Sequence, residues 1–110
     1  MPTANPNWKT EGIKNNPAVN TILADTGPLN LGINRYDVCI CSDVNCIVVL
    51  EWRDETNGAT VVAKTIPVNA REPFCEYNIV LETELDGERL RARLFAGVTG
   101  NVQATLQRVP

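Results

Sequence analysis

Alternation of apolar and polar residues with a period of two is the feature that most constrains how this chain folds. The alternation is clearest in residues 88–96, where leucine and alanine alternate with arginine, and in residues 102–109. A period of two places successive side chains on opposite faces of a β-strand. Each segment therefore has one apolar face for a core and one polar face for solvent, which is typical of antiparallel sheets.

The same pattern recurs along most of the chain, with clusters of glycine, proline, asparagine and aspartate between the segments. Such clusters are typical of turns, and no segment shows a sustained helical stripe. A chain of 110 residues is the length of a single domain. We therefore predict an all-β fold, a single antiparallel β-sandwich that is jelly-roll-like and has about seven strands. The strands are expected at residues 19–24, 33–41, 46–53, 60–68, 74–83, 88–96 and 102–109.

Residues 1–17 lack this pattern and predict an extended N-terminal arm. Pro2, Pro6 and Pro17 punctuate the segment, and proline lacks the backbone donor that a sheet needs. We expect the arm to be disordered or to lie along another surface, with Trp8 and Ile13 as the anchors that bind a partner. The chain then divides into the arm, residues 1–17, and the β-sandwich domain, residues 18–110.

Residues 38–50 are apolar on both faces of the expected strands, with residues 42–45 as a hairpin loop between them. One face carries Val38, Ile40, Ile47 and Val49, and the other carries Cys46, Val48, Leu50 and Trp52. A strand pair that is apolar on both faces must be covered twice. The second cover is expected to be the N-terminal arm or a neighbouring subunit.

The composition argues against several classes of function. The chain has no histidine, the side chain most often used as a general acid or base near neutral pH, so we expect no enzyme, no cofactor and no small-molecule substrate. The formal net charge of −3 argues against a nucleic-acid partner, which needs a cationic face. No apolar run approaches the ~20 residues of a membrane span, and the first residues do not resemble a secretory signal. We expect no membrane partner, and synthesis in a cytoplasm.

Four cysteines leave three interpretations open: they are Cys39, Cys41, Cys46 and Cys75. The expected hairpin places Cys41 opposite Cys46, where a disulfide could form, although folding in a cytoplasm disfavours one. A zinc site fits poorly, because structural zinc sites usually use Cys-x₂₋₄-Cys pairs and a flat strand face converges poorly on one ion. We therefore expect no metal, and the simplest interpretation is four small buried side chains.

Arg89, Arg91 and Arg93 share one face of an expected strand. Their charges repel one another unless they meet carboxylates, and Glu82 and Glu84 on the preceding strand are the candidates. The alternative is a stripe that docks an acidic protein surface, because the planar fork of arginine binds carboxylates.

Trp52 stands among charged residues at the end of a strand, in the sequence EWRD. In a sugar-binding module it would be a stacking platform, whereas the simpler interpretation is a tryptophan of the core or of an interface. We include Trp52 with Arg89, Arg91 and Arg93 among the candidate partner-binding residues of the sheet.

Several segments resemble those of small β-sandwich proteins that decorate, or cement, the capsids of tailed bacteriophages. They are ADTGPLNLG (24–32), RYDV (35–38), VLEWRD (49–54), GERLRARL (87–94) and GVTGNVQATL (97–106). The resemblance implies a jelly-roll-like domain that forms a homotrimer at symmetry axes of the shell and bridges neighbouring major capsid proteins. It also implies that the arm reaches over the shell, and that the protein is made in the host cytoplasm and ends on the capsid exterior of the virion.

Two functions follow as hypotheses. The first is a virion structural protein, a capsid decoration protein that binds and stabilises the head shell by adhesion. The alternative is a carbohydrate- or receptor-binding module, such as a fibre tip, which predicts an exposed aromatic cluster around Trp52.

Overall fold

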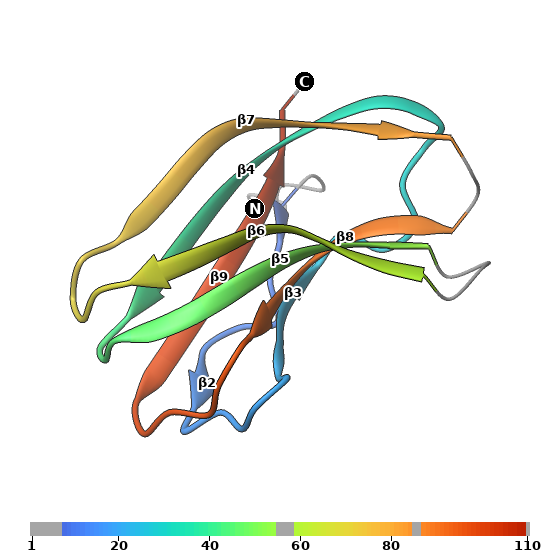
Figure 1. Ribbon diagram of the computed structural model, residues 1–110. Coiled ribbons are helices and arrows are strands. Elements are labelled where there is room, and N and C mark those ends of the chain that lie inside the picture. The colour runs from blue at the N-terminus through green and yellow to red at the C-terminus, as the bar shows by residue number, and fades with distance from the viewer. Residues whose placement is uncertain (1–7, 55–58, 85–86, 110) are drawn as a thin grey trace, which may run out of the picture.

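The computed structural model describes residues 8–54, 59–84 and 87–109, and the regular elements in them are all β-strands (Figure 1). The described residues contain no helix long and apolar enough to cross a membrane. Their nine strands are β1 (Trp8–Lys9), β2 (Lys14–Asn15), β3 (Ile22–Asp25), β4 (Gly32–Ser42), β5 (Cys46–Asp54), β6 (Ala59–Val68), β7 (Phe74–Thr83), β8 (Glu88–Leu94) and β9 (Asn101–Arg108).

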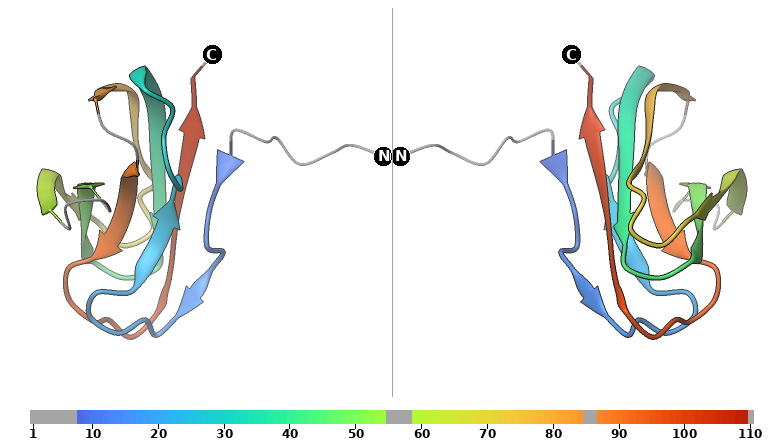
Figure 2. Two further views of the ribbon diagram at one scale, coloured as in Figure 1. Left: turned by 90° about the vertical axis from the view of Figure 1, so that its right-hand side faces the viewer. Right: turned by 90° about the vertical axis from the view of Figure 1, so that its left-hand side faces the viewer.

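The strands form two antiparallel sheets that pack face to face (Figure 2). Sheet A has the order β1-β9-β4-β7, and β2 also pairs with β9; sheet B has the order β3-β8-β5-β6. The predicted all-β sandwich is confirmed, and its seven predicted strands correspond to β3–β9 with shifts of a few residues at their ends. Ala96, for example, was expected in a strand but lies exposed beyond the end of β8.

The alternation correctly predicts which side chains form the core. Inner residues of both sheets, such as Leu90 in sheet B and Leu106 in sheet A, are completely buried. The core contains Leu23, Ala24, Leu29, Tyr36, Val38, Ile40, Cys46, Val48, Leu50, Ile66, Val68, Leu90, Ala92, Leu94, Val102, Ala104 and Leu106.

The hairpin predicted around residues 42–45 is wrong, because β4 and β5 lie in different sheets. The chain crosses between the sheets here, so Val38 on β4 and Val48 on β5 both point into the same core. The apolar residues of this region are thus divided between two inner faces, which accounts for most of the apparent excess. On the outer face of sheet B, Val49 is nevertheless buried and Ile47 is partly exposed.

The described part of the expected arm lies along the free edge of β9 (Figure 2). Backbone pairing joins Trp8 to Gln107 at one end of this segment and Lys14 to Val102 at the other. Between them, Thr10 Oγ1 donates a hydrogen bond to the Ala104 carbonyl at 2.7 Å. Residues 8–17 are therefore positioned by sheet A, whereas residues 1–7 lie outside the described residues.

The turn between β8 and β9 makes close contact with the β4–β5 connection at Gly100. Asp43 Oδ1 accepts a hydrogen bond from the Asn101 N–H at 2.8 Å, and the Gly100 N–H donates to Asn16 Oδ1 at 2.8 Å. Gly100 has a φ of 148°, and a Cβ placed on it would lie 2.7 Å from Val44 Cγ1. Only glycine therefore fits here without displacing the neighbouring loop.

We expect Gly100→Ala to destabilise the protein by about 2–4 kcal/mol, because it combines backbone strain with a steric clash. Gly27→Ala is the matched control, since Gly27 also has a positive φ, of 70°, but open space around its missing Cβ. The control should cost about 1 kcal/mol. Urea denaturation followed by circular dichroism measures both values, and equal losses would contradict the close contact at Gly100.

Candidate functional site

The three arginines lie on the outer face of β8, as the alternation predicts. The residues between them point into the core, and the neighbouring strands β3 and β5 supply their partners. On the β3 side, Arg89 Nη1 pairs with Asp25 Oδ2 at 3.2 Å. Arg91 and Arg93 meet on the β5 side, where they share one carboxylate.

That carboxylate belongs to Glu51, in the middle of β5. Glu51 Oε2 accepts hydrogen bonds from Arg91 Nη2 at 2.8 Å and Nε at 3.2 Å, and Oε1 accepts one from Arg93 Nε at 2.5 Å. Arg93 also donates from Nη1 to Asn20 Oδ1 at 2.6 Å. Both oxygens of Glu51 are thus used, and the side-chain geometry of the two arginines is fixed by the sheet itself.

Glu51 remains ionised although its side chain is only 4% exposed. Burial alone would raise its pKa, but hydrogen bonds from Arg91 and then from Arg93, with the positive charge of both, lower the pKa below its ordinary value. The Glu51 network, defined as Glu51, Arg91 and Arg93, therefore has two positive charges and one negative charge. Its stability depends on the carboxylate, because removing one member of a buried ion pair leaves uncompensated charge.

The carboxylates differ from those expected for the arginines. Glu82 lies on β7 of sheet A and Glu84 comes directly after that strand, whereas β8 lies in sheet B, so neither is on a strand paired with β8. Sequence reasoning missed Glu51. The one available signal was a carboxylate at an outward position between Val49 and Arg53 of a central strand.

Trp52 does not share a face with the arginines, contrary to the expected grouping. It pairs with Leu90 across β5 and β8, and the period of two places it on the inner face while Glu51 and Arg53 face outward. Its Nε1 is buried and has no hydrogen-bond partner in the part of the chain that the structure describes. Trp52 is thus an inward-facing tryptophan at the end of the core.

We expect Glu51→Gln to lower the free energy of unfolding at pH 7 by about 3 kcal/mol, because two arginines lose their shared countercharge. The lowered pKa means that the carboxylate contributes its full stabilisation above its ordinary pKa of 4.5 and loses it as the pH falls through the native pKa. The difference in stability between wild type and variant should therefore shrink below about pH 4.5.

Denaturation curves from pH 3 to pH 7 measure this difference. Glu82→Gln is the control, since Glu82 is exposed on the other sheet, and it should change stability by less than about 0.5 kcal/mol. A difference between wild type and Glu51→Gln that stays constant across this range would contradict the ionised network.

The outer face of sheet A carries the cysteines, in an arrangement that corrects the expected pairing. Cys39 on β4 and Cys75 on β7 are directly opposed in register and form a disulfide. Cys41 and Cys46, the pair considered for a disulfide, are free thiols. They cannot face each other across a hairpin because β4 and β5 belong to different sheets.

The two free thiols differ in environment. Cys41 is exposed on the outer face of sheet A, whereas Cys46 is buried in the core. Burial raises the pKa of Cys46, and a hydrogen bond with Ser42 offsets only part of that effect. The simple expectation of four buried cysteines therefore holds only for Cys46. No group of three or more metal-ligating side chains occurs within the described ranges.

We expect a thiol-reactive dye to label one cysteine in the native protein and two in the denatured, unreduced protein. The first is Cys41, which is exposed, and the second is Cys46, which becomes accessible only on unfolding. In Cys41→Ser the dye should label no cysteine in the native protein and one, Cys46, in the denatured, unreduced protein. Four labelled thiols without a reductant would contradict the Cys39–Cys75 disulfide.

Ile13 lies between the two short strands that hold the N-terminal segment on β9. Its side chain is 69% exposed, although β1 and β2 fix the backbone on both sides of it. It forms one wall of a recess of about 320 Å³ beside the free thiol of Cys41. The Ile13 recess is lined by Ile13, Cys41, Ser42, Asp43, Arg71, Asn101, Val102 and Gln103. Trp8, the other expected anchor, pairs through its backbone with Gln107, and its side chain is outside the description.

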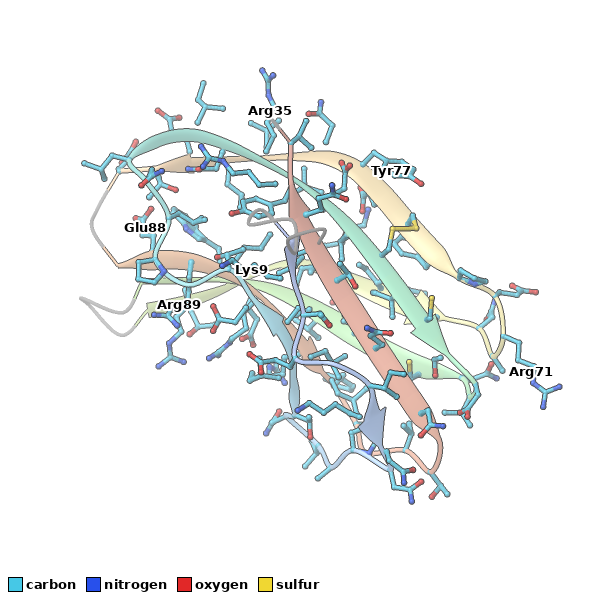
Figure 3. The ribbon with its side chains drawn as sticks, turned by 180° about the vertical axis from the view of Figure 1, so that it is seen from behind. Lys9, Arg35, Arg71, Tyr77, Glu88 and Arg89 are labelled. Carbon is cyan, nitrogen blue, oxygen red and sulfur yellow. A yellow bond between two sulfur atoms is a disulfide. The ribbon has the colours of Figure 1, made fainter. Side chains whose placement is uncertain are left out.

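Further apolar side chains are exposed near the other end of sheet A. Ile33 on β4 and Val80 on β7 are more than half exposed on its outer face, and Tyr77 projects from β7 into solvent (Figure 3). Exposed apolar groups on one face of a sheet are typical of surfaces that bind another protein. Among the described side chains, the arginine face of sheet B is more polar: its charged groups pair with one another, and Ile47 is its one exposed large apolar side chain.

No protein-family model matches the chain, and a search of curated proteins finds no significant relative.

Proposed function

We propose that this protein is a virion structural protein, a decoration protein that binds and stabilises the capsid shell of a tailed bacteriophage. The resemblance of its turn and strand sequences to such proteins supports the proposal. Binding is adhesive and is made by the edge of sheet A that β9 and residues 8–17 form, with the Ile13 recess beside it. The partner is the major capsid protein, and the site of action is the capsid exterior.

The observation that carries this proposal is the position of Ile13. The segment around Ile13 contains Gly12 and Pro17 and is positioned chiefly by pairing with β9, with further backbone hydrogen bonds from Glu11 N–H to the Leu23 carbonyl and from Asn16 N–H to the Gly100 carbonyl. That pairing holds the side chain of Ile13 69% exposed, where it does not pack into the core of its own chain. Ordering an apolar side chain in water has no benefit for the isolated domain, but it reduces the entropy lost when a partner binds.

The strand order supports the jelly-roll form of the proposal. Each connection between strands that follow one another along the chain, from β3 to β9, leads from one sheet to the other, except the connection from β5 to β6. Double-sheet jelly rolls of about eight strands occur in viral capsid proteins and in lectins. The lectin-like alternative expected an exposed aromatic cluster around Trp52, whereas Trp52 is partly buried on the inner face and no second aromatic side chain lines the recess beside it in the described residues.

The proposal includes a homotrimer as the form that binds. Ile33, Val80 and Tyr77 supply exposed apolar surface for contact between sister subunits, separate from the Ile13 recess. This assignment replaces the doubly apolar strand pair expected from the sequence, since the residues of β4 and β5 face a common core.

We expect Ile13→Ser to weaken binding to head shells that lack the protein by at least about tenfold, as for a buried apolar anchor at an interface. Co-sedimentation of the labelled protein with the shells measures the affinity. Val19→Ser is the matched control, because Val19 is 57% exposed but lies outside the recess. The control should bind as wild type does, and circular dichroism should show both variants folded. Unchanged binding by Ile13→Ser would contradict the proposed docking edge.

A further inference from the structure

A small polar pocket lies at one end of the sandwich, away from the Ile13 recess. Its volume is about 150 Å³. Three adjacent strands of sheet A contribute to it, together with the connection between β3 and β4. The pocket is lined by Lys9, Thr26, Pro28, Leu29, Asn30, Asn34, Tyr36 and Arg108.

Tyr36 is a buried residue of this pocket, with 5% of it exposed. Its hydroxyl forms no hydrogen bond among the residues that the structure describes, and it is not one of the buried atoms without a partner, so it is accessible from the pocket. A buried tyrosine usually directs its hydroxyl to a partner. Burial raises the pKa of Tyr36 and the nearby charge of Arg108 lowers it, so the hydroxyl keeps its proton at neutral pH and is available as a donor.

Two cations accompany this hydroxyl. Arg108 on β9 is directly opposite Tyr36 on β4, and Lys9 pairs with Leu106, two residues before Arg108. Within the described ranges, neither Lys9 nor Arg108 forms an ion pair. Figure 3 shows Lys9 between β1 and the segment that joins β3 to β4. The described lining of the pocket contains no carboxylate to neutralise these charges.

The remaining polar groups of the wall hold the pocket in shape. Asn34 Nδ2 donates to the Asn30 carbonyl at 2.8 Å, which closes the β3–β4 connection over the end of the core. Thr26 Oγ1 accepts a hydrogen bond from the Leu90 N–H at 3.0 Å and donates to the Gly27 carbonyl at 2.8 Å. These groups are satisfied internally, so the charged and hydroxyl donors that remain unused in the pocket are those of Tyr36, Lys9 and Arg108, beside the side-chain amide of Asn30.

We propose that this pocket binds a small oxyanion, a phosphate or a carboxylate group, through the side chains of Tyr36, Lys9 and Arg108. One hydroxyl, one ammonium and one guanidinium give several donors and two positive charges, which match the acceptor oxygens of such a group. A volume of about 150 Å³ admits one group of this size and excludes a large organic ligand. The proposal does not depend on the proposed capsid function, because none of the three residues lines the Ile13 recess.

Nuclear magnetic resonance titration of the full chain with inorganic phosphate, and separately with acetate, tests the proposal. Chloride at matched ionic strength corrects for general screening. We expect saturable shifts of the Tyr36, Lys9 and Arg108 signals with at least one of the two anions. Saturation by phosphate alone, or by acetate alone, supports the site and identifies its class of ligand. Shifts no larger than those with chloride, for both anions, would overturn the proposal.

Variants distinguish the pocket from a general attraction of anions to positive charge. Arg108→Gln and Lys9→Gln should each raise the dissociation constant of the bound anion at least tenfold, and Tyr36→Phe about threefold to tenfold. Tyr36→Phe removes only the hydroxyl and retains the buried ring, so it tests the pocket without emptying the core. Arg71→Gln, at an exposed loop on another side of the molecule (Figure 3), is the control and should bind as wild type does. Equal weakening by Arg71→Gln would overturn the assignment to this pocket.

Discussion

Pairing of β9 on both of its edges is the interaction on which the rest of this structure depends. On one edge β9 pairs with β4, which joins it to the rest of sheet A. On its other edge it pairs with β1 and β2. Its inner residues Val102, Ala104 and Leu106 are buried against sheet B, which makes the same strand part of the core. Both candidate binding regions depend on the edge of β9 that pairs with β1 and β2, because this pairing fixes Ile13 beside the recess and Lys9 beside Arg108.

The two outer faces of the sandwich then acquire different characters. On sheet B the charged side chains pair with one another, since both carboxylate oxygens of Glu51 accept hydrogen bonds from Arg91 and Arg93. Such a network favours a fixed arrangement of the sheet and leaves fewer donors for a partner. On sheet A the apolar side chains of Ile13 and Ile33 remain in water. The proposed adhesive surface is therefore on sheet A, although the arginines were the more conspicuous feature of the sequence.

The alternation of residues predicts strands and faces well because a period of two is a local property. It correctly assigned Leu90 and Leu106 to the core and the arginines to an outer face. It could not predict which strands pair, since a turn such as residues 42–45 suits a hairpin and a crossing between sheets equally. The Cys39–Cys75 disulfide and the partnership of Glu51 with two arginines both depend on that pairing. The pairing of residues 8–15 with β9 could not be predicted either, because β1 and β2 have two residues each and are too short to show an alternation of apolar and polar side chains.

The central claim is that the edge formed by β9 and residues 8–17 attaches this protein to a capsid. Single-particle reconstruction of purified phage head shells, with and without added protein, tests it most directly. The account predicts added density on the shell exterior, into which the sandwich fits with Ile13 and the edge of β9 against the capsid protein. Bare shells at saturating protein, or a sandwich attached by the arginine face of sheet B, would contradict it.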